Sequence, residues 1–284
     1  MQQETRTLGL VPVLSTQAGS CLTLANWEAA GVTSVSFNLI DLLMKPGLAV
    51  LNKLYDIRDY YKWPYKIILN AMLPAPDRED VYSFRSHYDG SLIRIDTRSL
   101  FALIGSLKPD AVMLPKGSAA SFEQFRTLLP AELALYFHSE DTVFDAGFKT
   151  YQYRVFESGH SFSLFLDSLK RDNKADYLTG DFDFQQLKQI AGFGKYLIET
   201  DIPAKDGEAG VVYSEEGAFN ILDSSMTNDS RSIDQSCQCQ TCRQLFTRAY
   251  LHHLLQQTPL LAQRYLVQHN IWTCQNYLSS FTSD

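Results

Sequence analysis

The chain has 284 residues, of which 45% are hydrophobic and 20% are charged, and this composition excludes a disordered, collagenous or coiled-coil protein. The formal net charge is −7, from 25 basic and 32 acidic residues, so any contact with nucleic-acid phosphates must be local. The longest apolar stretch, around residues 37–54, is interrupted by Asp41, Lys45 and Pro46, and the N-terminus lacks a basic region before its apolar run. We therefore expect a cytoplasmic protein without a membrane segment or secretory signal.

Short apolar runs rich in β-branched and aromatic residues alternate with segments of helical periodicity, which is typical of parallel sheets built from βα units. The expected strands are Leu10–Leu14, Val35–Asn38, Ile67–Asn70, Ala111–Leu114, Ala134–Phe137, Tyr153–Glu157, Tyr177–Gly180 and Tyr196–Glu199. The expected helices are Leu24–Ala30, Leu48–Lys62, Arg98–Leu107, Phe122–Leu129, Phe162–Lys170 and Phe184–Ala191. Eight such units predict an α/β protein with a (β/α)8 TIM barrel.

The barrel is predicted to occupy residues 1–201 and to carry a β-hairpin insertion at residues 81–95. This insertion alternates in polarity around Asp89-Gly90, a dipeptide strongly favoured in hairpin turns. Thr97 is the expected cap of the helix that follows.

Residues 202–236 are polar and rich in Gly, Ser and Asp, which predicts a linker with one short strand at Gly210–Tyr213. Residues 237–284 are predicted to form a helical subdomain. Its first helix covers residues 245–255, and Pro259 separates it from a second helix that ends near Gln268.

Three cysteines and one histidine in the C-terminal subdomain predict a metal site. Cys237, Cys239 and Cys242 lie within six residues, and His269 follows at the expected end of the second helix. Tetrahedral Zn²⁺ takes four such sulfur and nitrogen ligands, so we predict one structural zinc ion per chain. Cys274 is the alternative fourth ligand.

The order of these C-terminal motifs resembles the zinc subdomain of tRNA-guanine transglycosylases, enzymes that exchange a guanine in tRNA for a 7-deazaguanine of the queuosine or archaeosine type. The cysteine motif is followed by Thr-Arg-Ala-Tyr-Leu-His-His-Leu at 247–254 and by His269-Asn270. Segments at 16–17, 37–47, 84–91, 109–113 and 177–180 are similar to family segments in the same order. The resemblance implies a zinc-carrying (β/α)8 barrel.

The resemblance also implies positions for the catalytic groups, which in the family are an aspartate nucleophile and an acid/base carboxylate. The nucleophile position corresponds to Glu199, and Asp201 is an alternative that would point the same way if it continued the strand. The acid/base position corresponds to Asn70, whose amide cannot transfer the proton.

The substrate-binding positions implied by the resemblance also depart from the family pattern. Lys116 aligns with the base-recognising aspartate, and Glu157 and Gly159 replace a pair of glycines, whereas Gly180 is retained. In the basic loop that holds tRNA phosphates, Lys205 remains beside acidic residues at 206 and 208.

Three functions are compatible with these observations. The first is a catalytically degenerate or accessory subunit that contacts tRNA or DNA weakly and forms a homodimer, or a heterodimer with an active paralogue. Tyr250, Tyr265 and Trp272 are its expected exposed interface residues. The second is an active base-exchange enzyme with a remodelled pocket that uses Glu199 or Asp201. The third is a TIM-barrel protein that binds an unrelated ligand.

Overall fold

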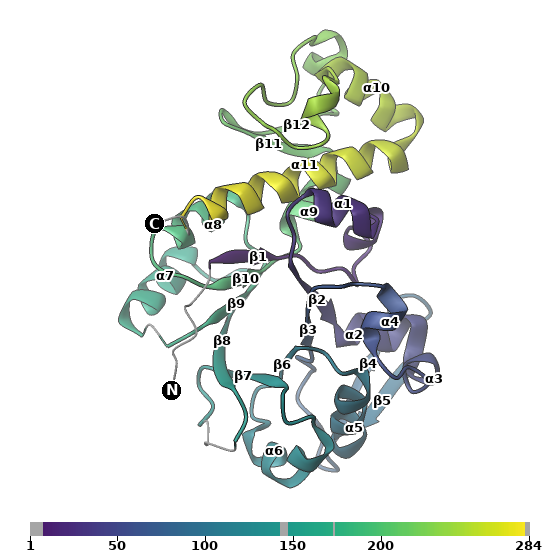
Figure 1. Cartoon of the computed structure of the whole chain (residues 1–284), viewed down its shortest axis with the longest axis vertical. Coiled ribbons are helices and arrows are strands. Elements are labelled where there is room, and N and C mark those ends of the chain that lie inside the picture. Colours follow the sequence, from purple (N-terminus) through teal and green to yellow (C-terminus); the bar gives the residue numbers. More distant parts are fainter. Residues whose placement is uncertain (1–7, 143–146, 173, 282–284) are drawn as a thin grey trace. The chain divides into compact units, whose positions relative to one another are not determined.

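The structure is a computed structural model that describes residues 8–142, 147–172 and 174–281 (Figure 1). The strands are β1 (Gly9–Val11), β2 (Ser34–Asn38), β3 (Lys66–Asn70), β4 (Val81–Arg85), β5 (Leu92–Asp96), β6 (Ala111–Met113), β7 (Ala134–His138), β8 (Thr150–Phe156), β9 (Tyr177–Gly180), β10 (Leu197–Glu199), β11 (Val211–Ser214) and β12 (Gly217–Asn220).

The α-helices are α1 (Leu24–Ala29), α2 (Leu39–Leu42), α3 (Leu48–Leu51), α4 (Ile57–Tyr61), α5 (Thr97–Leu107), α6 (Ala119–Phe125), α7 (Phe162–Arg171), α8 (Phe184–Ala191), α9 (Ile202–Glu208), α10 (Arg248–Gln257) and α11 (Pro259–Ser279). Short helical turns are η1 (Gly19–Cys21), η2 (Leu43–Gly47), η3 (Arg126–Leu128), η4 (Ser224–Asn228) and η5 (Cys242–Gln244).

The chain divides into two compact units, and one of them comprises the described residues of 34–155 and 172–178. Its parallel strands follow the order β8-β7-β6-β3-β2. Val35, Ile67 and Val112 are completely buried, as expected for strands covered on both faces. The β4–β5 pair is antiparallel, with Val81 opposite Asp96, so the predicted hairpin insertion is confirmed.

The other unit comprises the described residues of 1–33, 156–171 and 179–284. Here β1 pairs in parallel with β10, and the predicted bounds of β9 and α8 agree with the structure. Eight parallel strands in the two units, separated along the chain by helical segments, confirm the predicted α/β fold of the TIM-barrel class.

Three helix predictions in the barrel segment were wrong. The helix expected at 122–129 begins earlier, as α6, and gives way to the turn η3 at Arg126. The single helix expected at 48–62 is divided into α3 and α4, because Asp56 starts a new helix by accepting a hydrogen bond from the backbone nitrogen of Arg58 at 2.7 Å. The cap of α5 is Asp96 instead of Thr97, since Asp96 accepts from the backbone nitrogen of Ser99.

The segment 202–236 contains more regular structure than the linker we predicted. It begins with α9, and the expected strand becomes a hairpin in which Val211 on β11 lies opposite Asn220 on β12. The second C-terminal helix is also longer than predicted, because α11 extends over 21 residues. His269 therefore lies within this helix and not at its end.

The C-terminal subdomain shares an apolar core with the preceding segment, and this core includes Val212 on β11, Leu251 on α10 and Leu266 on α11. Tyr265 and Trp272 pack against this core and are only partly exposed, so the expectation that both lie fully on the surface was wrong. Tyr250 is 45% exposed, in agreement with the expectation. Within the described part of the chain, the search for a helix able to cross a bilayer finds none.

Candidate functional site

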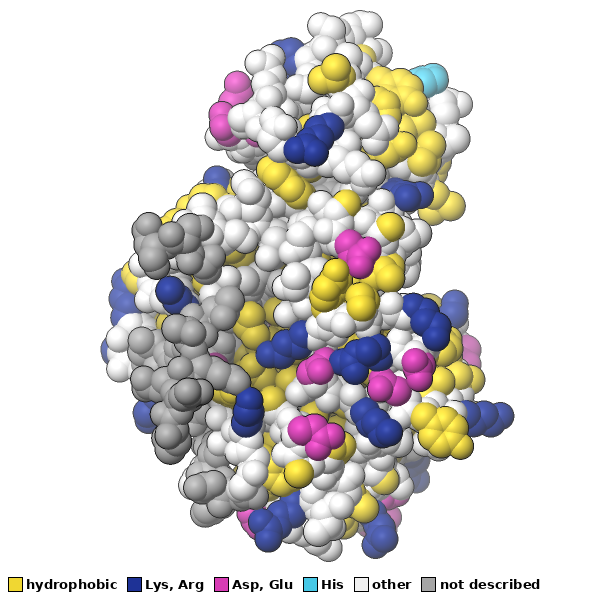
Figure 2. Space-filling view, in the orientation of Figure 1, with side chains coloured by type: hydrophobic (Ala, Val, Ile, Leu, Met, Phe, Trp, Pro, Cys, Tyr) yellow, Lys and Arg dark blue, Asp and Glu magenta, His cyan; other side chains and the backbone are white. Residues whose placement is uncertain are grey.

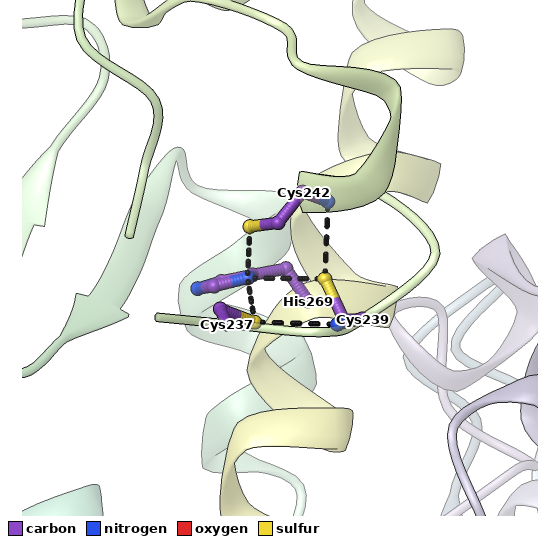
Figure 3. Close-up of side chains that lie close together, drawn as sticks. All are labelled: Cys237, Cys239, Cys242 and His269. Atoms are coloured by element: carbon purple, nitrogen blue, oxygen red, sulfur yellow. Dashed lines mark hydrogen bonds between the residues drawn. The ribbon is translucent and has the colours of Figure 1, made fainter. Parts of the chain in front are cut away.

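The four predicted zinc ligands converge in the C-terminal subdomain (Figure 3). The Nδ1 atom of His269 lies 3.6 Å from the Sγ atom of Cys237 and 3.4 Å from that of Cys239, and the Sγ atom of Cys242 is also at 3.4 Å. The four ligand atoms lie within 4.8 Å of one another. Zinc bonds of about 2.0–2.3 Å place tetrahedral neighbours roughly 3.5–3.8 Å apart, so this donor set fits a structural zinc ion.

The backbone of the cysteine loop directs the thiols toward one point. The backbone nitrogens of Cys239 and Cys242 donate to the preceding cysteine sulfurs, at 3.5 Å and 3.3 Å. Asp234 accepts a hydrogen bond from the backbone nitrogen of Cys237. Hydrogen bonds within the cluster lower the pKa of Cys239 and raise that of Cys242, whereas zinc binding requires the thiolate form of each cysteine.

His269 is oriented by a hydrogen bond on the far side of its ring. The side chain is completely buried, and Nε2 lies 2.7 Å from the carbonyl oxygen of Tyr213. Donation from Nε2 leaves Nδ1 free to bind a metal. Cys274 is buried on the same helix but does not belong to the cluster, and burial raises the pKa of its thiol. The geometry therefore favours His269 over Cys274 as the fourth ligand.

Glu199 is the last residue of β10 and is 3% exposed. Its Oε1 atom accepts a hydrogen bond of 2.8 Å from the hydroxyl of Thr179 on β9. In a barrel of this class, the C-terminal ends of the strands carry the reactive side chains. A buried carboxylate in a fixed orientation thus occupies the position that the resemblance assigns to the nucleophile.

Asp201 does not continue the strand, contrary to the premise of our prediction. The strand ends at Glu199, and Asp201 has helical backbone angles at the start of α9. Its Oδ1 atom accepts a hydrogen bond of 3.0 Å from the hydroxyl of Thr16, and Oδ2 lies 3.6 Å from Nζ of Lys205. The two carboxylates are therefore held by different neighbours.

The segment predicted to contact nucleic-acid phosphates is helix α9 and not a loop. Nζ of Lys205 lies 3.6 Å from Asp201 and 3.9 Å from Asp181. Asp206 accepts from the hydroxyl of Tyr213 at 2.5 Å, and Glu208 accepts from Gln17 at 2.6 Å. The charged side chains of α9 thus bind mainly to neighbouring protein groups.

Asn70 is the last residue of β3 and is 7% exposed. Its Oδ1 atom accepts a hydrogen bond of 3.1 Å from the backbone nitrogen of Met72. This contact is local, because Met72 lies only two residues further along the chain. The side chain that occupies the implied acid/base position is therefore a neutral amide with a local structural contact.

Lys116 follows β6, and its Nζ atom lies 2.6 Å from Oε2 of Glu140, beyond β7. The backbone nitrogen of Gly117 donates to Asp141 at 3.1 Å, so two acidic residues after β7 hold the Lys116 loop. The sequence prediction missed both partners, although they lie only two and three residues after His138. Burial, and secondly the charge of Lys116, lowers the pKa of His138.

The remaining predicted substrate-binding residues lie after β8 and β9. Glu157 is exposed, and its carboxylate lies 3.5 Å from Nδ1 of His160. Gly159 has a positive φ of +91° and open space around its Cα. Gly180 packs closely instead, since a Cβ atom there would lie 2.4 Å from the carbonyl oxygen of Phe156.

Comparison with known proteins agrees with the resemblance seen in the sequence. The family model described as queuine tRNA-ribosyltransferase matches residues 160–281. The chain is 24% identical to the queuine tRNA-ribosyltransferase of Dehalococcoides mccartyi over 312 aligned residues, which cover 94% of this chain and 79% of that protein. It is 25% identical to the enzyme of the same name from Thioalkalivibrio sulfidiphilus, with 93% and 83% covered.

A shorter alignment of higher identity involves the queuine tRNA-ribosyltransferase of Clostridium perfringens. That alignment is 33% identical over 101 residues and covers 36% of this chain and 26% of the relative. The weak similarity over nearly the whole chain and the family match over its C-terminal part lead to the same assignment. The comparisons therefore support the tRNA-guanine transglycosylase family for this chain.

Proposed function

We propose that this protein is a transglycosylase-like zinc protein of 7-deazaguanine modification whose own catalytic centre is degenerate, and that it serves as the accessory subunit of an active family member. Family membership and the Cys₃His cluster support a role in this type of modification. The zinc ion would be structural, because three cysteines and one histidine fill its four positions and leave none for water.

Asn70 carries the proposal. General acid/base catalysis needs a group that gains and loses a proton near neutral pH, and a carboxamide does not ionise in that range. The Asn70 amide is also engaged by the backbone nitrogen of Met72. Removal of a positioned acid/base typically slows a reaction by about 10²- to 10⁴-fold.

Base recognition is altered at a second position. A carboxylate can accept hydrogen bonds from the N–H groups of a purine, whereas a lysine ammonium can only donate. The Lys116 ammonium already lies 2.6 Å from the carboxylate of Glu140. Hydrogen bonding to guanine at this strand end therefore has to differ from that implied by the family pattern.

An active enzyme with a remodelled pocket is the second candidate, and one observation favours it. Glu199 retains a buried carboxylate at the end of β10, oriented by Thr179. Such a group could attack the ribose if the substrate approached it closely. Asp201 is the weaker candidate, because Thr16 and Lys205 both engage its oxygens.

We propose that tRNA, or DNA, is contacted weakly by this protein alone. Lys205 is near two carboxylates, and the chain carries a net charge of −7. Each phosphate contact by a lysine or arginine steepens the salt dependence of binding. We expect a shallow salt dependence for the isolated protein and a steeper one when an active subunit is present.

The proposed partner surface lies on the C-terminal subdomain. Figure 2 shows apolar side chains gathered in the region of α10. Tyr250 on α10 and Leu261 near the start of α11 are 45% and 43% exposed. The ring of Phe246 connects this surface to the subdomain core, with its centre 5.0 Å from that of Tyr250. Exposed aromatic and aliphatic groups of this kind favour protein contacts, so we propose a dimer, either homomeric or with an active paralogue in the cytoplasm.

The test is incorporation of labelled guanine into bulk tRNA by the purified zinc-loaded protein, alone and with a family member from the same cell. We expect background incorporation alone and a faster rate per active chain in the mixture. A Glu199→Ala variant should behave as the wild type in both samples. Robust turnover by the wild type alone that disappears in this variant would support the remodelled enzyme. A protein that neither binds tRNA or DNA nor alters the partner's rate would support a barrel with an unrelated ligand.

A further inference from the structure

We propose that Asn270 and Gly207 are positioning residues that couple the Cys₃His centre to helix α9, which directly follows Glu199, Thr200 and Asp201. In this arrangement, metal binding at His269 sets the position of α11, and α11 in turn holds α9. The inference goes beyond the proposed function, because it applies whether or not Glu199 is reactive.

Asn270 connects three elements through one buried amide. It follows the ligand His269 and is completely buried. Its Nδ2 atom donates to the carbonyl oxygens of Pro203 at 3.1 Å and Val211 at 2.9 Å, and its Oδ1 atom accepts from the backbone nitrogen of Tyr213 at 3.2 Å. Both donor positions of the amide are used, so its loss would leave buried backbone groups without this partner.

Tyr213 provides a second connection between the cluster and α9. Its carbonyl oxygen accepts from Nε2 of His269 at 2.7 Å, and its backbone nitrogen donates to Asn270. Its hydroxyl donates to Asp206 on α9 at 2.5 Å. Two consecutive residues of α11 thus fix the backbone of Tyr213, and the side chain of Tyr213 contacts α9.

Close packing of α9 against α11 completes the arrangement (Figure 1). A Cβ atom on Gly207 would lie 2.7 Å from the backbone of Val267, so only glycine permits this approach. Nε2 of Gln263 donates to the carbonyl oxygen of Glu208 at 3.0 Å. Residues 263, 267 and 270 have the spacing of one helix face, and this face of α11 follows the whole length of α9.

Helix α9 depends on this contact because of its length. It has seven residues and includes Pro203 and Gly207, and isolated helices shorter than about 12–15 residues are marginal in water. Since α9 begins next to Asp201, its position determines where the chain leaves the end of β10. The zinc cluster would therefore stabilise a segment that contains none of its ligands.

The experiment is hydrogen–deuterium exchange of peptides covering residues 202–210. It compares zinc-loaded wild type, wild type stripped with a chelator, and zinc-loaded Asn270→Ala. We expect Asn270→Ala to keep about one zinc ion while exchange in this peptide rises about tenfold or more. Removal of zinc from the wild type should raise exchange in the 202–210 peptide by a similar factor. Removal of zinc from Asn270→Ala should change exchange in this peptide little, while exchange in the cysteine segment, residues 237–242, should still rise.

Gln268→Ala is the matched control, because this buried amide on the same helix donates to Gln240 and accepts from Asn26, and neither partner lies on α9. Its 202–210 peptide should exchange as in the wild type. Gly207→Ala tests the packing contact without changing the Asn270 side chain, and it should accelerate hydrogen exchange in the same peptide. If Asn270→Ala does not fold, Gly207→Ala still tests whether α11 holds α9. The proposal is overturned if zinc-loaded Gly207→Ala and Asn270→Ala both exchange like the wild type at 202–210, or if zinc removal loosens only the cysteine segment.

Discussion

The polar side chains of the Cys₃His cluster converge on one another, whereas those at the strand ends bind to neighbouring protein groups. In the cluster, four donor atoms lie within 4.8 Å of one another, with the surrounding hydrogen bonds directed to orient them. At the strand ends, Asn70 and Lys116 are engaged by neighbouring groups of the protein. A site can thus retain the metal-binding part of a family pattern while the residues implied for chemistry take structural contacts. The proposal of a degenerate subunit depends on this difference.

Loss of a ligand should produce the largest effect. We expect Cys239→Ala to reduce bound zinc from about one equivalent to below about half and to unfold the C-terminal subdomain, since structural zinc contributes roughly 10–16 kcal/mol in zinc-finger peptides. Elemental analysis and circular dichroism would measure this. Cys274→Ala is the control, because Cys274 lies outside the cluster. Zinc retained in His269→Ala but lost in Cys274→Ala would reassign the fourth ligand.

The next largest effect is expected at a glycine of the strand-end region. Gly180→Ala should destabilise the protein by about 1–3 kcal/mol, because its Cβ would lie 2.4 Å from a backbone oxygen. Gly159→Ala should cost less, about 1 kcal/mol, since Gly159 has a positive φ but open surroundings. Urea denaturation of both variants is the measurement. Equal stability of the two would show that close packing is not the role of Gly180.

A smaller effect, dependent on pH, is expected at Asp206. Burial raises the pKa of its carboxyl above the ordinary value, although the hydrogen bond from Tyr213 opposes the shift. The folded state therefore binds this proton more tightly than the unfolded state, and the wild type loses stability as pH rises through the raised pKa. Asp206→Asn keeps an acceptor for Tyr213 and does not titrate.

The stability of Asp206→Asn relative to the wild type should consequently increase between about pH 4 and about pH 7. Free energies of unfolding at the two pH values would measure the change. A relative stability that falls over this range would show that the charged carboxylate is the favoured form, and that the hydrogen bond outweighs burial.

The smallest effect is expected at Lys116. The Lys116–Glu140 pair is exposed on both sides, at 59% and 69%, and pairs of this kind add little stability. Lys116→Ala should shift the melting temperature by less than about 2 °C. A melting temperature lower by several degrees would show that Lys116 stabilises the strand ends as much as the buried groups do.

The sequence predicted the barrel strands and the residues of the Cys₃His cluster because each depends on local patterns. Strands covered on both faces appear as short apolar runs, and closely spaced cysteines with a histidine are typical of zinc sites. Helix α9 was missed because Pro203, Gly207 and its acidic residues resemble a linker. Its stability comes from α11, more than 50 residues away along the chain.

Other differences arise from competition between local signals and distant contacts. The break between α3 and α4 follows from the capping side chain of Asp56, a signal that the apolar periodicity concealed. The pairing of Lys116 with Glu140 joins the ends of two different strands. No fixed separation along the sequence marks such a pair, so the sequence alone does not predict it. The alternative role of Asp201 required the strand to continue beyond its predicted end at Glu199, and propensity alone does not locate a strand end to one residue.

A single-turnover measurement tests the central claim most directly. Zinc-loaded protein in large excess over tRNA carrying labelled guanine would reveal even one slow cleavage event, without dependence on product release. If the chemical centre is degenerate as proposed, guanine release should equal that of Glu199→Gln, because Asn70 supplies no proton transfer. Release that clearly exceeds background in the wild type and returns to background in Glu199→Gln would contradict the account and identify Glu199 as a working nucleophile.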